Sequence, residues 1–157
     1  MTASKKHMIL INDSTLRDGN HAVSHEIDID QITAYCTAAD AANVPIIEIG
    51  HGNGLGASSL QIGLSKISDE MILKTARSSI KNSKLSVHVI PGFATIERDL
   101  KPAIEIGVDV FRIASHCTEA DITERHISFC RDNGKSVFGV LMMSHMADKE
   151  VLLHEAQ

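Results

Sequence analysis

The chain has 157 residues, of which 43% are hydrophobic and 22% are charged, a composition ordinary for a globular domain that buries its own core. Its net charge is −5 and it carries no basic run, so neither nucleic acid nor an anionic membrane is an expected partner. No apolar stretch approaches the roughly 20 residues that span a bilayer, and three cysteines without a CxxC pair indicate reduced thiols in a cytoplasmic protein.

Short runs rich in β-branched residues alternate with helical patterns along the chain. The first helical pattern places Ile32, Tyr35, Cys36 and Ala39 on one face. Thr118, followed three residues later by Asp121, predicts a capped helix start. The predicted strands are 8–12, 46–50, 85–90, 110–114 and 137–142, and the predicted helices are 30–42, 68–81, 96–106, 118–134 and one that begins at 149.

This alternation predicts βαβ units, and therefore a parallel sheet covered by helices. Two α/β folds use the pattern: an open, doubly wound sheet of the flavodoxin type and the closed eight-stranded barrel. Periodicity does not choose between them. The sequence shows no linker, low-complexity stretch or composition shift, so residues 1–157 are expected to belong to one domain.

Ionisable residues gather directly after the predicted strands. Four of the five strand ends carry histidine or an Arg-Asp pair, which is typical of the active-site face of an α/β protein. The residues concerned are Arg17, Asp18 and His21 after the first strand, His51 after the second, His116 after the fourth and His145 after the fifth.

A glycine-rich loop at 50–56 follows the second strand. Its spacing is GxGxGxG, and no helix begins directly after it. The dinucleotide-binding fingerprint requires GxGxxG leading into a helix, so the loop is not expected to hold phosphate.

The segment Asp-Ser-Thr-Leu-Arg-Asp-Gly at 13–19 resembles the signature of the barrel superfamily that contains 3-hydroxy-3-methylglutaryl-CoA lyase, isopropylmalate synthase and the pyruvate aldolases. The segments at 51–59, 116–121 and 141–146 resemble the 4-hydroxy-2-oxovalerate aldolases more narrowly. The resemblance implies a (β/α)₈ TIM barrel. Such a barrel needs eight strands and typically about 250 residues, so five βα units predict an incomplete barrel, the amino-terminal part of an aldolase domain.

The resemblance also implies roles for four residues. Arg17 would stabilise the pyruvate enolate, Glu48 would hold Arg17 in place, and His21 would be the general base. Asp18 would be a ligand of a catalytic Mn²⁺ or Mg²⁺ ion. The other ligands in that family are histidines of a His-x-His element, which this sequence lacks, so the metal site is expected to be incomplete. A helix cap or a pairing with Arg17 for Asp18, a structural ion pair for Arg17 and a solvated loop position for His21 are the alternatives.

The other strand-end histidines are expected to line the substrate pocket or to shape its hydrogen bonds, with a purely structural role as the alternative: His51, His116 and His145. His88 lies inside the third strand and is expected to be a hydrogen-bonded core residue. Cys117 is not expected to act as a nucleophile with His116, because adjacent residues point apart on a strand. Cys36 and Cys130 lie on apolar helix faces and are expected in the core.

The function implied is that of a lyase: retro-aldol cleavage of a 4-hydroxy-2-oxo acid to pyruvate and an aldehyde. The resemblance implies an acylating aldehyde dehydrogenase as a partner that takes up the aldehyde. The incomplete barrel predicts two further partners: a carboxy-terminal half that completes it, and other copies of the chain in a homo-oligomer. Two alternatives stay open: a non-catalytic remnant or assembly module, and a Claisen-type acyltransferase of the same superfamily.

Overall fold

The computed structural model describes residues 9–157, so Met8 of the first predicted strand lies outside the described residues. The strands are β1 (Asn12–Asp13), β2 (Ile46–Ile49), β3 (Lys84–Val89), β4 (Val110–His116) and β5 (Ser136–Met142). The helices are α1 (Thr15–Gly19), α2 (Ile29–Ala41), α3 (Asp69–Ser79), α4 (Lys101–Ile106), α5 (Glu124–Asp132) and α6 (Lys149–Glu155). A π-helical turn, η1 (Ile96–Leu100), and two 3-10 turns, η2 (Ala120–Thr123) and η3 (Ser144–Met146), complete the described chain.

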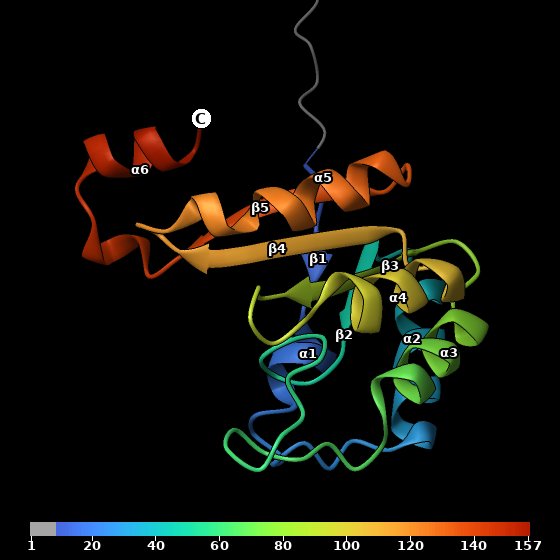
Figure 1. The fold of residues 1–157 in the computed structure, drawn as a ribbon. Helices are drawn as coiled ribbons and strands as arrows, with labels where there is room; N and C mark the ends of the chain where they lie inside the picture. The colour runs from blue at the N-terminus through green and yellow to red at the C-terminus, as the bar shows by residue number, and fades with distance from the viewer. Residues whose placement is uncertain (1–8) are drawn as a thin grey trace, which may run out of the picture.

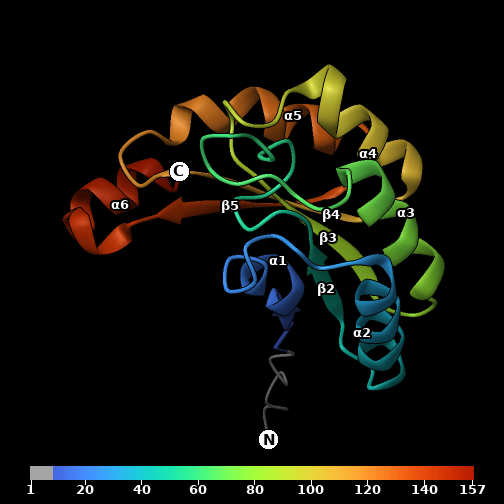
Figure 2. The same ribbon diagram turned by 90° about the horizontal axis from the view of Figure 1, so that it is seen from below.

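Within residues 9–157 the strands form one five-stranded sheet in the order β1-β2-β3-β4-β5, and every neighbouring pair is parallel. Helices α2 to α5 follow one another around the outside of the curved sheet, while α1 lies on the inner side (Figures 1 and 2). A flavodoxin-type sheet has the strand order 2-1-3-4-5. The sequential order and the curvature therefore define a half-barrel, which confirms the predicted incomplete TIM barrel.

Alternate residues of each strand face opposite sides of the sheet. The residues that face outward pack against the helices in one hydrophobic cluster, for example Ile47, Val87 and Phe111 with Ile32 and Cys36 of α2. The inner, concave face carries Glu48, His88 and Arg112, together with apolar side chains such as Ile46 and Val110. Cys36 and Cys130 are fully buried in the outer cluster, as predicted.

Helices α2 and α3 begin at residues whose side chains cap them. Asp28 and Gln31 form a reciprocal capping box before α2, and the Ser68 hydroxyl accepts a hydrogen bond from the Met71 N–H before α3. Both helices lie within two residues of their predicted bounds. The caps fix where each helix begins, next to the apolar period that predicted it.

Three predicted elements differ from the structure. Strand β1 is only Asn12–Asp13, because its neighbour β2 begins at Ile46 and offers no backbone partner to the residues before Asn12. The helix predicted over 96–106 is divided into the π-helical turn η1 and α4. The predicted cap at Thr118 is wrong, since the Thr118 hydroxyl contacts the His116 ring 2.8 Å away and the helical segment begins at Ala120.

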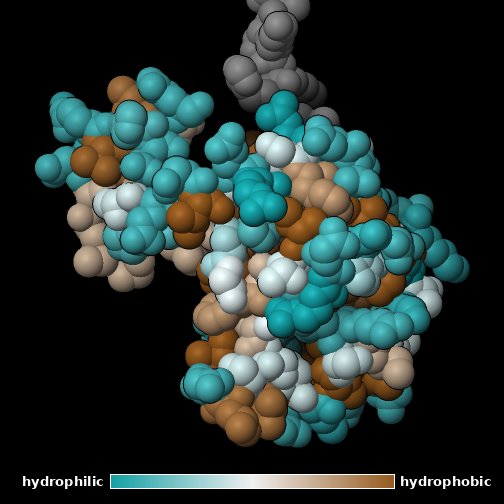
Figure 3. Space-filling model, viewed as in Figure 1, coloured by the Kyte–Doolittle hydropathy of each residue, from teal (hydrophilic) through white to brown (hydrophobic). Residues whose placement is uncertain are grey.

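Strand β5 and helix α6 form the less buried end of the molecule. Phe138 of β5 is 45% exposed and Leu153 of α6 is 65% exposed. The space-filling view shows the α6 end as a lobe that stands apart from the main body (Figure 3), in agreement with the ribbon. A hydrogen bond from the Ala120 N–H to the Glu155 carboxylate joins α6 to the turn η2 of the main body. Among residues 9–157, no helix combines the length and apolarity needed to cross a membrane.

Candidate active site

A buried carboxylate between two guanidinium groups forms the centre of the concave face. Glu48 of β2 is fully buried, and its Oε1 accepts a hydrogen bond from Arg17 Nε at 2.9 Å. Arg112 of β4 donates through its Nη1 to both Glu48 oxygens, at 3.1 and 2.8 Å. Asn12 of β1 adds an amide donor at 3.2 Å. The predicted Arg17–Glu48 pair is therefore present, with a second arginine that the sequence analysis did not identify.

This arrangement keeps Glu48 ionised. Burial by itself would raise its pKa, but the hydrogen bonds and positive charges of Arg112 and Arg17 outweigh burial and hold the pKa below its ordinary value. A buried charge that is paired in this way fixes the position of its partners, because moving either guanidinium away would leave a carboxylate without compensation. Glu48 thus holds the Arg17 side chain at the carboxyl end of the strands.

Asp18 lies beside Arg17, with its side chain 68% exposed and one oxygen 2.8 Å from Arg17 Nη1. Within residues 9–157, no three His, Cys, Asp or Glu side chains are grouped in a way that could hold a metal ion. A single exposed carboxylate is a poor site for Mn²⁺ or Mg²⁺, which take several oxygen ligands. The described residues therefore do not by themselves assemble the metal site implied by the resemblance.

Three histidine rings lie together where the loops after α1 and β2 meet. The rings of His25 and His51 are stacked, with centroids 3.7 Å apart and planes 7° from parallel. His21 meets both edge-on, with its ring centroid 5.3 Å from that of His25 and 6.4 Å from that of His51. His21 is exposed, whereas the other two rings are buried.

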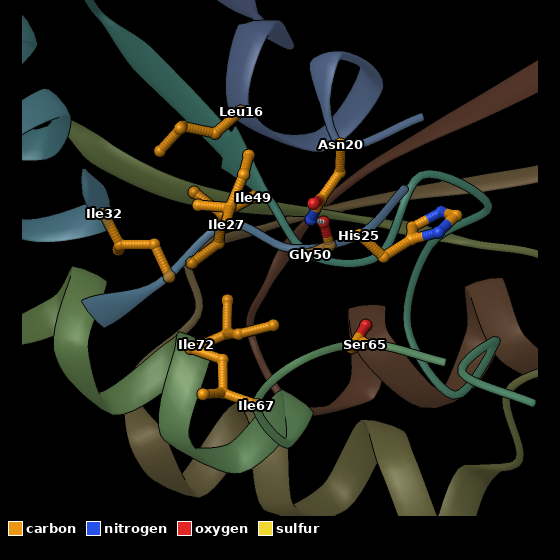
Figure 4. Close-up of a pocket in the computed structure, with 10 residues that line it drawn as sticks. All are labelled: Leu16, Asn20, His25, Ile27, Ile32, Ile49, Gly50, Ser65, Ile67 and Ile72. Carbon is orange, nitrogen blue, oxygen red and sulfur yellow. Dashed lines mark hydrogen bonds between the residues drawn. The ribbon is translucent and has the colours of Figure 1, made fainter. Parts of the chain in front are cut away.

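A hydrogen bond from the Asn20 amide to the Gly50 carbonyl, 2.9 Å long, joins these two loops. Figure 4 shows Asn20 directed toward Gly50 above a small cavity whose other wall is formed by isoleucines, Ile49 and Ile72 among them. The ring of His25 extends away from these apolar side chains. The lining of the cavity is therefore mainly apolar, and His25 of the histidine cluster lies at its polar end, on the same side as Asn20.

His88 of β3 lies on the concave face, in register with Arg112 of β4. Its burial was predicted, but the expected hydrogen bonding is not seen at one ring nitrogen, because Nδ1 is buried without a partner in the described structure. Burial, reinforced by the positive charge of Arg17, lowers the pKa of His88 to about 4, so the ring is neutral at pH 7.

The remaining predicted residues lie farther along the sheet. His116 ends β4 and contacts Thr118, and His145 is exposed in the turn η3 after β5. Neither takes part in the ring contacts or ion pairs described above. Cys117 is buried, and its thiol donates to the Met143 carbonyl at 3.4 Å.

Two residues of the site were missed in the sequence. Arg112 lies inside an apolar strand between Phe111 and Ile113. A charged residue in that setting needs a buried partner, so the sequence did contain a signal for Arg112. His25 lies in a polar loop segment where nothing local distinguishes it from a solvated histidine. Only the fold brings it against His51.

The fold and the site define a half-barrel α/β protein with a charged, histidine-rich face at the strand ends. A family model described as HMGL-like matches residues 8–157. The chain therefore belongs to the HMGL-like family.

Curated relatives are named for one activity. The chain is 64% identical over all of its 157 residues to a 4-hydroxy-2-oxovalerate aldolase of Spirochaeta aurantia, covering 46% of that protein. It is 58% identical over 149 residues, 95% of the chain, to a 4-hydroxy-2-oxovalerate aldolase of Pectobacterium atrosepticum, covering 43% of it. The chain thus spans less than half the length of these relatives.

A solved structure supports the fold. The N-terminal domain of a Bacteroides vulgatus protein described as an aldolase superposes with a TM-score of 0.68 at 22% identity. The match covers 87% of this chain and 46% of that one. At this identity the likeness concerns the fold.

Proposed function

We propose that the chain supplies the enolate-stabilising and proton-transferring residues of a lyase that cleaves a 4-hydroxy-2-oxo acid to pyruvate and an aldehyde. The observation that carries the proposal is the placement of Arg17 by the buried Glu48 carboxylate, with His21 four residues farther along the same strand-end loop. The names of the relatives support the same activity.

Retro-aldol cleavage needs these two groups. A base takes the proton from the C4 hydroxyl, the C3–C4 bond breaks, and C4 leaves as the aldehyde while the electron pair forms an enolate over C2 and C3. Arg17 would meet the negative charge that develops on the C2 oxygen, and His21 would accept the hydroxyl proton. The enolate then takes a proton at C3 and leaves as pyruvate.

The complete enzyme needs more than the described residues. We propose that Asp18 supplies one ligand of a Mn²⁺ or Mg²⁺ ion whose other ligands come from outside these 157 residues, and that such an ion would add positive charge near the substrate oxygens. We further propose that His51, His116 and His145 line the substrate pocket of the completed barrel, that the barrel assembles as a homo-oligomer, and that the aldehyde passes to an acylating aldehyde dehydrogenase.

The test is to complete the barrel by co-expressing the chain with the remaining part of the Spirochaeta aurantia relative and to measure pyruvate release from 4-hydroxy-2-oxovalerate. Arg17→Ala should abolish release. His21→Ala should lower kcat by about 10²–10⁴-fold, the usual contribution of a general base, and alter the pH profile. The exposed residue His154 provides a matched control, and His154→Ala should change neither.

Each alternative has a distinct outcome with the completed barrel. In a second assay, supplied with a 2-oxo acid and an acyl-CoA, condensation of the two without aldol cleavage would identify a Claisen-type acyltransferase. A folded, completed barrel with neither activity would identify a non-catalytic assembly module. A His21→Ala variant with unchanged rate and pH profile would show that His21 is not the base.

A further inference from the structure

The loop that carries His21 holds a second histidine in an unusual backbone conformation. Ser24 and His25 both adopt the left-handed conformation, with φ of 52° and 62°. Non-glycine residues adopt this conformation at a cost in free energy, and it persists where the surrounding structure holds it. Here the His25 N–H donates to the Asn20 carbonyl at 2.8 Å, and the Lys66 N–H donates to the His25 carbonyl at 3.0 Å. The backbone of His25 is therefore fixed on both sides.

The ring on which His25 stacks is fixed as well. The Asn53 N–H donates to His51 Nδ1 at 3.0 Å, so Nδ1 must carry a lone pair. Nε2 then carries the proton and donates it to the Gly63 carbonyl 3.1 Å away. Both nitrogens of His51 are occupied in its neutral form, and the ring has one orientation and one tautomer.

Two glycines leave room for these rings. A Cβ atom at Gly52 would lie 2.5 Å from the His21 ring, and a Cβ atom at Gly63 would lie 2.7 Å from His25 Nδ1. Both distances are far shorter than van der Waals contact, so only glycine leaves space for the His21 and His25 rings at these two positions of the loop after β2. The His21 ring thus has Gly52 on one side and His25 and His51 as its aromatic neighbours.

We propose that His25 is a positioning residue for His21, and that the His25–His51 stack forms a rigid wall which orients the His21 ring toward the substrate. This inference rests on the proposed role of His21 as the general base. Burial, followed by the charges of the neighbouring histidines, lowers the pKa of His25, and burial lowers that of His51, so the wall is uncharged near pH 7. A base must be held within a fraction of an ångström of its working geometry, and packing against fixed rings provides this.

The first test is NMR spectroscopy of the chain labelled with ¹³C,¹⁵N-histidine. The wild-type chain should show nuclear Overhauser effects between the ring protons of His21 and His25 and between those of His25 and His51, and the ¹⁵N shifts of His51 should report the Nε2–H tautomer. Absence of the His21–His25 effect in the folded chain would overturn the proposal, whatever the behaviour of any variant.

Variants then separate ring packing from other roles. His25→Phe keeps an aromatic ring against His51 and should leave the His21 resonances well separated from those of the exposed His154. His25→Ala should move the His21 ring resonances toward those of His154, while the half-buried His126 stays unchanged as a control. If His21 is unmoved in a folded His25→Ala chain, His25 does not position it.

The second test uses the completed barrel described above. His25→Ala should lower kcat by up to about 10²-fold, the cost of misplacing a reacting group by about 1 Å, with little change in KM, and His25→Phe should recover most of the loss. Equal loss in both variants would contradict positioning by ring packing. If the wild-type barrel releases no pyruvate, the proposed function fails, and the NMR result still decides whether His25 orients the His21 ring.

Discussion

Replacing Glu48 by glutamine should destabilise the chain strongly, although the substitution conserves volume. Glutamine removes the negative charge and directs an amide donor at guanidinium groups that are themselves donors. Breaking a buried ion pair on one side typically costs about 3–5 kcal/mol. The side chains of Arg17 and Arg112 are 14% and 25% exposed, so some water reaches them, and we expect a loss near the lower value, about 3 kcal/mol.

Urea denaturation at pH 7, followed by circular dichroism, measures this loss. With the slope usual for small proteins, about 1–3 kcal/mol per molar urea, the midpoint should fall by roughly 1–3 M. Glu70→Gln is the matched control, because Glu70 forms an exposed i,i+4 pair with Lys74 on α3, and its midpoint should stay within error of the wild type. Adding Arg112→Met to Glu48→Gln should restore part of the loss, since it removes one unpaired charge.

The same carboxylate makes stability depend on pH. Because the folded-state pKa of Glu48 lies below its ordinary value of 4.5, the stabilisation is fully present above that pH and is lost as the pH falls through the folded-state pKa. Glu48→Gln should lack this part of the acid dependence. A Glu48→Gln chain whose free energy of unfolding stays within about 0.5 kcal/mol of the wild type, the range of ordinary surface changes, would refute the buried ion network as described.

Three further predictions concern the chain by itself. Purified chain should release no measurable pyruvate from 4-hydroxy-2-oxovalerate with Mn²⁺, because Asp18 is a lone carboxylate among the described residues; robust metal-dependent turnover would contradict this. Sedimentation equilibrium at micromolar concentration should show self-association, most simply a two-fold dimer. The reason is that β5 lies at the edge of the sheet formed by residues 9–157 and exposes apolar side chains such as Phe138. A monomer with a cooperative melt would refute this prediction. Backbone hydrogen bonds from Ser83 and Asn82 lower the pKa of Asp40 to about 2. The stability that the ionised Asp40 carboxylate contributes is therefore present above about pH 4 and is lost as the pH falls toward 2. Between pH 4 and pH 2, the melting temperature of Asp40→Asn should fall less steeply than that of the wild type.

The sequence by itself determined the order and kind of the elements. Hydrophobic period and β-branched runs are local properties, and they located β2 to β5 and α2 and α3 to within a few residues. The Asp-Ser-Thr-Leu-Arg-Asp-Gly segment and the histidines after the strands also lie in continuous stretches. For that reason the family, the half-barrel and the residues Arg17, His21 and Glu48 could be named before the structure was known.

Tertiary structure decided which of these residues meet. Arg112 of β4 reaches Glu48 of β2 across 64 positions of sequence because both side chains point to the concave face from the two strands that flank β3. This is a consequence of register that no local pattern contains. His25 stacks on His51 because a left-handed turn and the Asn20–Gly50 hydrogen bond bring two loops together. The length of β1 and the partner of Thr118 were likewise set by neighbours in space, since a strand forms only where another backbone lies beside it.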